Sequence, residues 1–282
     1  MTPFTSLFRF RDERGEVHYG EAGASSNHTL DTLVGRDVSI FRGGKPWDEG
    51  FVLTDEKRKV LCPLPQTPIF MCVGLNYKQH AQEAKMSHGE YPVVFTKPPD
   101  ALAGPFDTIK VPAACLNMDY EAELCLVIGK DCRDFSPSND PSEYILGYTA
   151  GNDVSSRYWQ NPERSGGQHG YAKSFDKFAP IGPVITSPPD FGNLAGLRIQ
   201  CFVNGEKRQS GTLDDLIFSV PAVLAHLSQG TTLRKGTVIM TGTPSGVAAF
   251  MKPPAWLKDG DVVEVHIDRI GTMRNIFSIE KA

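Results

Sequence analysis

The sequence predicts an α+β fold that is mainly β, with few short helices and a small N-terminal domain. Short segments rich in β-branched residues recur along the chain, whereas few stretches carry a run of helix formers. The 27 glycines and 21 prolines supply turns between these segments. A chain of 282 residues accommodates one large and one small domain, and 40% hydrophobic residues suffice for a packed core.

Residues 1–66 are predicted to form the small N-terminal domain. The opening stretch MTPFTSLFRFRDERGEVHYG alternates apolar and polar side chains around a turn at Gly15, which predicts a β-hairpin. Its acidic residues argue against a transit peptide. The proline-rich segment LCPLPQTP, residues 61–68, predicts a rigid connection to a second domain that spans residues 67–282.

The second domain is predicted to contain many strands and two helices. NYKQHAQEAK, residues 76–85, lacks Pro and Gly and has Asn76 as a candidate N-cap. LDDLIFSVPAVLAHLS, residues 213–228, is the second helix, with Pro221 as a kink or a boundary between two shorter helices. The predicted strands are, in order, IFMCVGL, PVVFTK, ELCLVIG, YILGYTAGNDV, PIGPVIT, LRIQCFVNG, GTVIMTG and DVVEVHIDRIG.

Charge and cysteine content limit the classes of partner and compartment. The net charge of -4 does not favour binding to nucleic acid or to an anionic membrane. We find no apolar run near the roughly 18 residues that a membrane span requires. The six cysteines show no CxxC pair, which is typical of reduced, buried thiols. We therefore expect a cytoplasmic protein, with a mitochondrial location left open.

The stretch DYEAELCLVIG, residues 119–129, places three acids before an apolar run. Because successive side chains of a strand point to opposite faces, Asp119, Glu121 and Glu123 share one face. Neighbouring carboxylates repel unless a cation lies between them, and Mg²⁺ or Mn²⁺ prefers oxygen ligands. The structural alternative is an exposed face with solvated acids, which an isolated E-x-E motif favours.

The other candidate site residues are weak predictions when each is taken alone. Asp153 follows a predicted strand in a turn, where acids are common. His80 and Glu83 are three residues apart and therefore share one helix face. The pair is either a general base with its orienting carboxylate or an ordinary pair on the surface. Lys173 lies between aromatic residues in GYAKSFD. Its ammonium group either reaches past them to solvent or is partly desolvated and polarises the carbonyl of a ligand. The turn in VIMTGTPSG offers backbone N–H groups to an anion.

Taken in order, eight segments resemble the fumarylacetoacetate hydrolase superfamily from about residue 70 to the C-terminus. They are GLNYKQHAQEA, PVVFTKPPDALAGP, DYEAELCLVIGK, GYTAGNDVSSRYWQ, AKSFDKFAPIGPVI, VNGEKRQSG, VIMTGTPSGV and LKDGDVVEVHIDRIG. The resemblance implies a mixed β-sandwich roll, often homodimeric, with one divalent metal ion per site. It implies Glu121, Glu123 and Asp153 as metal ligands, and a dyad of His80 and Glu83 on a segment that orders with substrate.

Four further residues receive roles from the resemblance. Lys173 matches a lysine that faces the substrate, and Gln160 matches a glutamine that places water or substrate. Arg157 and Thr243 match residues near the substrate, Thr243 close to its carboxylate. The polar, Gly-rich segment 161–171 departs from the family pattern, and we expect it to be a loop near the site.

The resemblance implies an enzyme that uses Mg²⁺, or Mn²⁺, on a small 2-oxo or β-dicarbonyl acid. We rank hydrolysis of a C–C bond in an acylpyruvate-type substrate first, through a metal-bound enolate. Oxaloacetate decarboxylation or keto–enol tautomerisation is the alternative, and a non-catalytic scaffold is less favoured. Zinc is disfavoured because six histidines show no ligand spacing with cysteine, and we interpret them as ordinary surface or core residues: His18, His28, His88, His169, His226 and His266.

Overall fold

The computed structural model of the chain describes residues 4–34, 38–41, 50–53 and 58–281. Strands dominate this part of the chain and the helices are short, so the predicted α+β, mainly β class is confirmed. Several residues of the predicted N-terminal domain lie outside the described ranges, and the domain boundary at residue 66 stays a prediction. None of the described helices is long and apolar enough to cross a membrane.

The largest sheet has 12 strands in the order β4-β3-β2-β1-β15-β13-β11-β19-β6-β7, with β5 beside β1 and β8 beside β15. Its strands are β1 (Ser6–Arg11), β2 (Val17–Glu21), β3 (Val38–Phe41), β4 (Gly50–Leu53), β5 (Lys59–Leu61), β6 (Phe70–Gly74), β7 (Val93–Lys97), β8 (Leu102–Ala103), β11 (Ala122–Ile128), β13 (Ile145–Asn152), β15 (Ala179–Thr186) and β19 (Val238–Met240).

A second sheet of 5 strands has the order β17-β16-β20-β21-β9. It consists of β9 (Thr108–Val111), β16 (Arg198–Val203), β17 (Glu206–Thr212), β20 (Val262–Ile267) and β21 (Gly271–Ile279). Two small ribbons are formed by β10 (Met118–Asp119) with β14 (Ser155–Ser156), and by β12 (Cys132–Arg133) with β18 (Thr232–Leu233). The two larger sheets contact each other through β11, β13 and β15 on one side and β16, β20 and β21 on the other.

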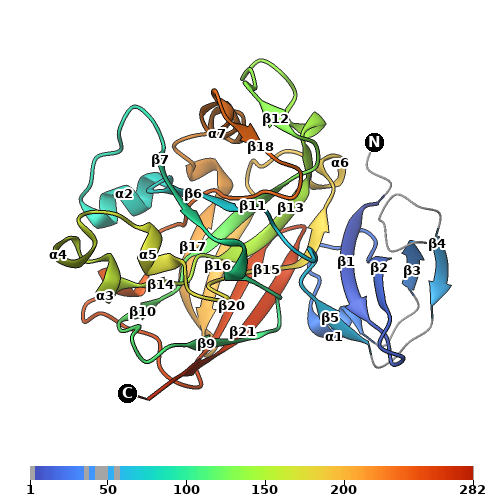
Figure 1. Ribbon diagram of the computed structural model, residues 1–282, viewed down its shortest axis with the longest axis horizontal. Coiled ribbons are helices and arrows are strands. Elements are labelled where there is room, and N and C mark those ends of the chain that lie inside the picture. Colours follow the sequence, from blue (N-terminus) through green and yellow to red (C-terminus); the bar gives the residue numbers. More distant parts are fainter. Residues whose placement is uncertain (1–3, 35–37, 42–49, 54–57, 282) are drawn as a thin grey trace.

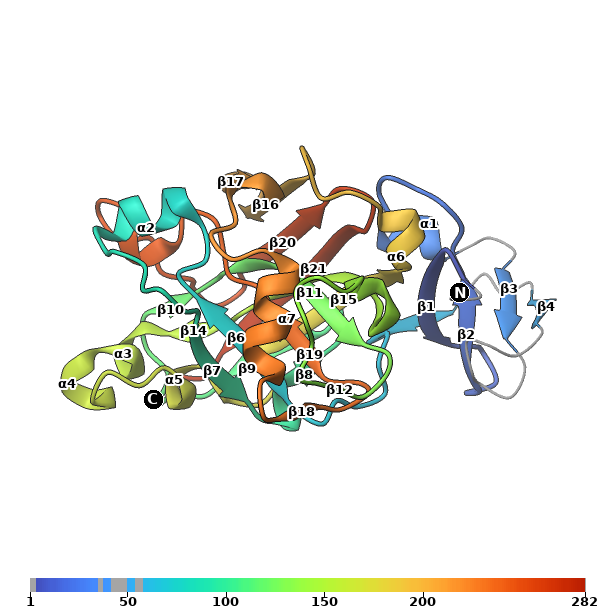
Figure 2. The same ribbon diagram turned by 90° about the horizontal axis from the view of Figure 1, so that it is seen from above.

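The helices lie around the sheets and mostly span one or two turns. They are α1 (Leu30–Leu33), α2 (Lys78–Ala84), α3 (Arg157–Gln160), α4 (Pro162–Ser165), α5 (Gly170–Lys173), α6 (Pro188–Phe191) and α7 (Val220–Ser228), with 3₁₀ turns η2 (Pro99–Ala101), η3 (Pro141–Glu143), η4 (Leu213–Asp215) and η5 (Ala248–Phe250). Figures 1 and 2 place β1–β4 at one end of the molecule and α2–α5 at the opposite end.

Strand β11 separates two apolar clusters, as its alternation predicts. Leu124 and Leu126 belong to the larger cluster, whereas Cys125 and Val127 belong to a smaller cluster on the other face. The acidic residues of the strand share the second face. A core strand therefore carries its carboxylates directly into a buried environment, and the alternative of an exposed acidic face is wrong: Glu123 is 1% exposed.

Most predicted elements are present, with corrections at helix ends. The N-terminal hairpin forms between β1 and β2, with Gly15 at a φ of +88° in its turn. Asn76 is not the N-cap of α2, because its side chain instead bonds Phe218 and Thr241 and ties the start of α2 to two other segments. Pro221 lies in the first turn of α7, so it marks a boundary and not a kink.

Candidate active site

A cavity of about 170 Å³ is lined in part by residues of α2, α3 and α5. Seven of the nine predicted site residues line it, namely His80, Glu121, Glu123, Arg157, Gln160, Lys173 and Thr243. The other two, Glu83 and Asp153, lie directly behind the wall, bonded to His80 and Lys173. The structure thus brings all nine to one place, although it does not by itself assign their roles.

Strand pairing explains why three carboxylates converge. Glu121 and Glu123 project to the same face at the start of β11. Strand β13 pairs antiparallel with β11, so Asp153, just beyond the end of β13, arrives beside Glu121 and donates its N–H to the Glu121 carbonyl at 2.9 Å. One oxygen from each of Glu121, Glu123 and Asp153 lies within 4.8 Å of the others, and all three residues are buried.

The two glutamates of this cluster have opposite electrostatic surroundings. Burial alone raises the pKa of a carboxyl group, but Lys173 and Arg157 overcome burial at Glu121 and lower its pKa to about 2. Lys173 Nζ lies 2.9 Å and Arg157 Nη2 2.6 Å from the Glu121 carboxylate. At Glu123, burial together with the charges of Asp153 and Glu121 raises the pKa well above its usual value. Within the described residues, Glu123 has no cation at salt-bridge distance and accepts only the Gly242 N–H, at 2.7 Å.

Two buried lysines hold Asp153 from opposite sides. Lys173 Nζ donates to Asp153 at 2.6 Å and to Ser155 at 2.7 Å. Although burial opposes its charge, Asp153 and Glu121 raise the pKa of Lys173 to about 12. Lys97 Nζ donates to the other Asp153 oxygen at 2.5 Å and to the Phe178 carbonyl. Lys97 was not among the predicted site residues.

The donor set and the charge balance both fit a divalent cation. Four buried carboxyl groups, when all are ionised, outnumber by one the two buried lysines and the partly buried arginine beside them; they are Asp119, Glu121, Glu123 and Asp153, and Lys97, Lys173 and Arg157. The imbalance is concentrated at Glu123, whose carboxylate lacks a cationic partner. Clustered carboxylate oxygens are ligands for hard ions such as Mg²⁺ and Mn²⁺. A buried acidic triad that could hold a divalent metal is therefore present.

The loop after β19 orients two carboxylates through backbone N–H groups. Gly242 has a φ of +100° and directs its N–H at Glu123, while Gly246 has a φ of +102° and directs its N–H at Glu83, 3.0 Å away. L-residues rarely adopt such φ values, so glycine is required at both turns. The turn was predicted to hold an anion, and the anions it holds are carboxylates of the protein itself.

His80 and Glu83 form the predicted pair on α2. His80 Nδ1 lies 3.0 Å from Glu83 Oε2, and the imidazole ring packs 5.7 Å from the ring of Phe250. A carboxylate only accepts hydrogen bonds, so Nδ1 is the donor, and in the neutral tautomer Nε2 carries the lone pair. Because His80 lines the cavity, this arrangement provides a base at the cavity wall.

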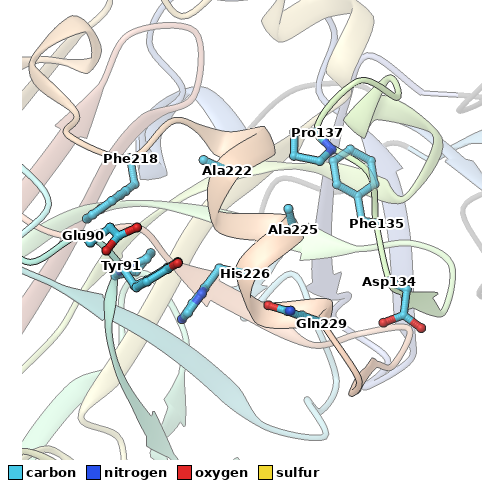
Figure 3. Close-up of a pocket in the computed structure, with 11 residues that line it drawn as sticks. Glu90, Tyr91, Asp134, Phe135, Pro137, Phe218, Ala222, Ala225, His226 and Gln229 are labelled. Carbon is cyan, nitrogen blue, oxygen red and sulfur yellow. The ribbon is translucent and has the colours of Figure 1, made fainter.

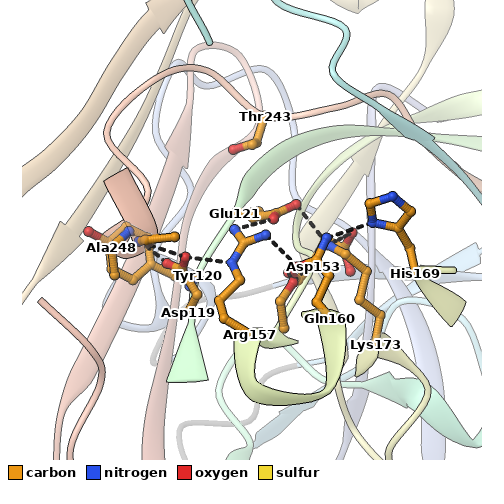
Figure 4. A network of polar contacts seen from close by, with 12 residues as sticks. Asp119, Tyr120, Glu121, Asp153, Arg157, Gln160, His169, Lys173, Thr243 and Ala248 are labelled. Atoms are coloured by element: carbon orange, nitrogen blue, oxygen red, sulfur yellow. Dashed lines mark hydrogen bonds and ion pairs between the residues drawn. The ribbon is translucent and has the colours of Figure 1, made fainter. Parts of the chain in front are cut away.

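A chain of hydrogen bonds crosses the floor of the site (Figure 4). Arg157 Nε bonds Asp119 at 2.8 Å, and Arg157 Nη1 bonds Gln160 Oε1 at 2.6 Å. Gln160 Nε2 lies 2.6 Å from His169 Nδ1. Asp119 also accepts backbone N–H groups of Ala248 and Ala249, at 2.8 and 3.1 Å. These contacts hold the Arg157 guanidinium where its Nη2 donates to Glu121.

The segment 161–171 differs from the predicted loop. It begins with the short helix α4 and runs into α5, and it carries His169 into the cavity wall. We interpret His169 from the sequence alone as an ordinary surface or core histidine, and the structure places it in the cavity wall. Thr243, by contrast, lines the cavity as predicted, and its hydroxyl oxygen accepts a bond from Gln209 Nε2 at 2.7 Å, which leaves its own hydrogen free to donate.

A mainly β fold with a buried acidic triad and a histidine–glutamate pair beside a small cavity is the arrangement of an enzyme-type site. A family model described as fumarylacetoacetate (FAA) hydrolase C-terminal matches residues 69–278. The chain belongs to the fumarylacetoacetate hydrolase family.

Two similar proteins and one similar solved structure carry functional names. A human protein named oxaloacetate tautomerase FAHD2A, mitochondrial, is 36% identical over 79% of this chain and 71% of its own. Oxaloacetate tautomerase YisK of Bacillus subtilis is 38% identical over 82% of this chain and 77% of its own. The crystal structure of 2-hydroxyhepta-2,4-diene-1,7-dioate isomerase from Mycobacterium marinum superposes with a TM-score of 0.80 at 31% identity, covering 99% and 100% of the two chains.

Proposed function

We propose that this protein is a divalent-metal-dependent keto–enol tautomerase that acts on oxaloacetate or a closely similar 2-oxo dicarboxylic acid. The observation that carries the proposal is that His80 and two acids of the buried triad, Glu121 and Glu123, line one small cavity, with Asp153 directly behind its wall. The names of two relatives support the same substrate. Tautomerisation, the alternative outcome of the sequence analysis, therefore replaces C–C hydrolysis as the leading hypothesis.

The reaction requires one proton to move between carbon and oxygen. In the keto form, His80 Nε2 removes a proton from C3 of the substrate, and the electron pair shifts to the C2 oxygen. The imidazolium then returns the proton to that oxygen, which gives the enol. Glu83 stabilises the imidazolium through Nδ1, and the Gly246 N–H holds Glu83 in position.

Glu121, Glu123 and Asp153 would hold the metal ion, with Mg²⁺ first and Mn²⁺ as a substitute. Bound there, the ion would supply Lewis-acid stabilisation for negative charge on the 2-oxo and carboxylate oxygens of the substrate. Arg157 and Lys173 fix the orientation of Glu121 from two sides. Both cations also reduce the repulsion that an anionic substrate meets on entering an acidic cavity.

Acylpyruvate hydrolysis remains a second candidate function. The pair of His80 and Glu83 could equally deprotonate a water that attacks the distal carbonyl, and the released three-carbon enolate would then need the same stabilisation. Oxaloacetate decarboxylation would produce that enolate by loss of carbon dioxide. The three outcomes differ in their products, so products discriminate between them.

The test follows products from oxaloacetate and acetylpyruvate with Mg²⁺ and, separately, with chelator. In D₂O, a tautomerase accelerates the enol-to-keto conversion and the uptake of deuterium at C3 of oxaloacetate, both seen by NMR. Formation of pyruvate from oxaloacetate indicates decarboxylation, and formation of acetate and pyruvate from acetylpyruvate indicates hydrolysis. Dominant pyruvate formation with unaccelerated tautomerisation contradicts the proposal.

Assembly and compartment stay predictions. A homodimer is expected from the family, and its mass is measured by light scattering after size-exclusion chromatography. A cytoplasmic location is expected from the thiols, and a mitochondrial location is expected if the name of the human relative applies here.

A further inference from the structure

The hydrogen-bond chain that ends at His169 fixes which nitrogen of its ring carries the hydrogen. Arginine only donates, so Gln160 must present its carbonyl oxygen to Arg157. The amide nitrogen of Gln160 is then the atom that meets His169 Nδ1, and it also donates. His169 Nδ1 is therefore an acceptor, and in the neutral ring the hydrogen resides on Nε2.

The Nε2–H of His169 is left to meet a ligand. His169 lines the cavity, and within the described residues Nδ1 alone of its two ring nitrogens is hydrogen-bonded. The ring is stacked on Phe95, 5.6 Å away between centroids, and Lys173 Nζ lies 5.0 Å from the centroid of the same phenyl ring. Burial and the nearby charge of Lys173 lower the pKa of His169, which favours the neutral ring.

His169 lies at one end of the site. In Figure 4 the chain runs from Asp119 through Arg157 and Gln160 to His169, which is the member farthest from Asp119. Thr243, another donor in the cavity wall, directly follows Gly242, whose N–H binds Glu123. His169 is instead bonded to Gln160 and stacked on Phe95, so the two donors line different parts of the cavity wall.

We propose that His169 is a specificity-determining residue that donates Nε2–H to an oxygen at the far end of the substrate, and thereby selects dicarboxylic over monocarboxylic 2-oxo acids. This inference rests on the proposed function, because it takes the 2-oxo carboxylate end to lie at the triad. An alkyl or methyl end offers no acceptor, so it would leave a desolvated N–H without a partner. The relay through Gln160 keeps the donor aimed at the cavity.

The test compares two inhibitors that bind without reacting. Oxalate carries the two-carbon head alone, whereas malate adds a second carboxylate two carbons further on. In His169→Phe, which keeps an aromatic ring on Phe95 and removes the donor, we expect the dissociation constant of malate with Mg²⁺ to rise roughly tenfold to hundredfold. The dissociation constant of oxalate should change less than about twofold. Isothermal titration calorimetry measures both.

Two further variants make the result specific. His169→Gln retains a side-chain donor and should recover part of the malate affinity. Tyr171→Phe changes a 62% exposed residue two positions along the same segment and should bind both ligands as the native protein does. Unchanged malate affinity in His169→Phe, with oxalate still bound, overturns the role of His169 alone. Failure of oxalate to bind the native protein with Mg²⁺ overturns the proposed function and this inference with it.

Discussion

Two of the cavities in the described part of the chain differ in character, and the larger of these two lacks a buried acidic cluster. A cavity of about 460 Å³ lies beside α7, between Phe218, Ala222, Ala225 and neighbouring aromatic and charged side chains (Figure 3). Its acids, such as Glu90 and Asp134, are exposed to solvent. The smaller cavity, of about 170 Å³, instead gathers buried carboxylates, cations and a histidine base. Converging buried charge, more than volume, identifies a site for catalysis.

The largest expected difference is in the tautomerisation rate after one glutamate in each cavity is replaced by glutamine. Glu123→Gln keeps the shape and the acceptor for Gly242 but removes a ligand charge, so metal-dependent tautomerisation should fall to the background rate. Glu90→Gln in the larger cavity should leave the rate unchanged. Steady-state assays with and without Mg²⁺ measure both, with circular dichroism as the folding check. Full Mg²⁺-dependent activity in Glu123→Gln would refute the ligand assignment.

The next difference is in kcat after one histidine in each cavity is replaced by alanine. His80→Ala removes the base that Glu83 orients, and loss of a general base typically costs about 10²–10⁴-fold in rate. His226→Ala removes an imidazole that stacks on Tyr91 in the larger cavity and should cost less than about twofold. The readout is kcat for oxaloacetate at saturating Mg²⁺. A comparable loss in both variants would mean that His80 acts through structure and not as a base.

A third difference concerns stability. Arg157→Leu leaves the buried carboxylates of Asp119 and Glu121 without their arginine, which should lower the free energy of unfolding by about 3–5 kcal/mol. Arg133→Leu breaks an ion pair with Asp134 beside the larger cavity, where both side chains are 61% exposed. It should cost at most about 1 kcal/mol. Urea denaturation gives both values, and equal losses would contradict the electrostatic contrast between the two cavities.

The smallest effect is expected at the surface of the larger cavity. Tyr91 is 62% exposed, so Tyr91→Ala should change the free energy of unfolding by no more than about 0.5 kcal/mol and leave kcat unaltered. The same assays serve here. A large drop in turnover would show that the two cavities are energetically coupled and would contradict their expected independence.

Local patterns predicted the parts of the site that lie within one element. The alternation along β11 places Glu121 and Glu123 on one face, and helical spacing places His80 and Glu83 together. Asp153 could be joined to them only through the family resemblance, because its approach depends on the register between β13 and β11. No single-segment pattern encodes that register.

Three residues of the site escaped prediction for the same reason. Lys97 ends a strand before two prolines and resembles an exposed strand end, yet it is 1% exposed beneath Asp153. Asp119 was assigned to the acidic face of β11 without its arginine partner, which comes from α3. His169 follows a Gly-rich stretch, and only the packing of α5 beside α3 brings its ring to Gln160. Tertiary contacts, not composition, place all three.

The central claim is that Glu121, Glu123 and Asp153 jointly bind one divalent ion. Diffraction from crystals grown with Mn²⁺, recorded where manganese scatters anomalously, tests this claim most directly. We expect one anomalous peak within bonding distance of all three carboxylates, and no peak at that place in crystals of Glu123→Gln. Crystals that bind Mn²⁺ elsewhere, or that show these carboxylates with no peak between them, would contradict it.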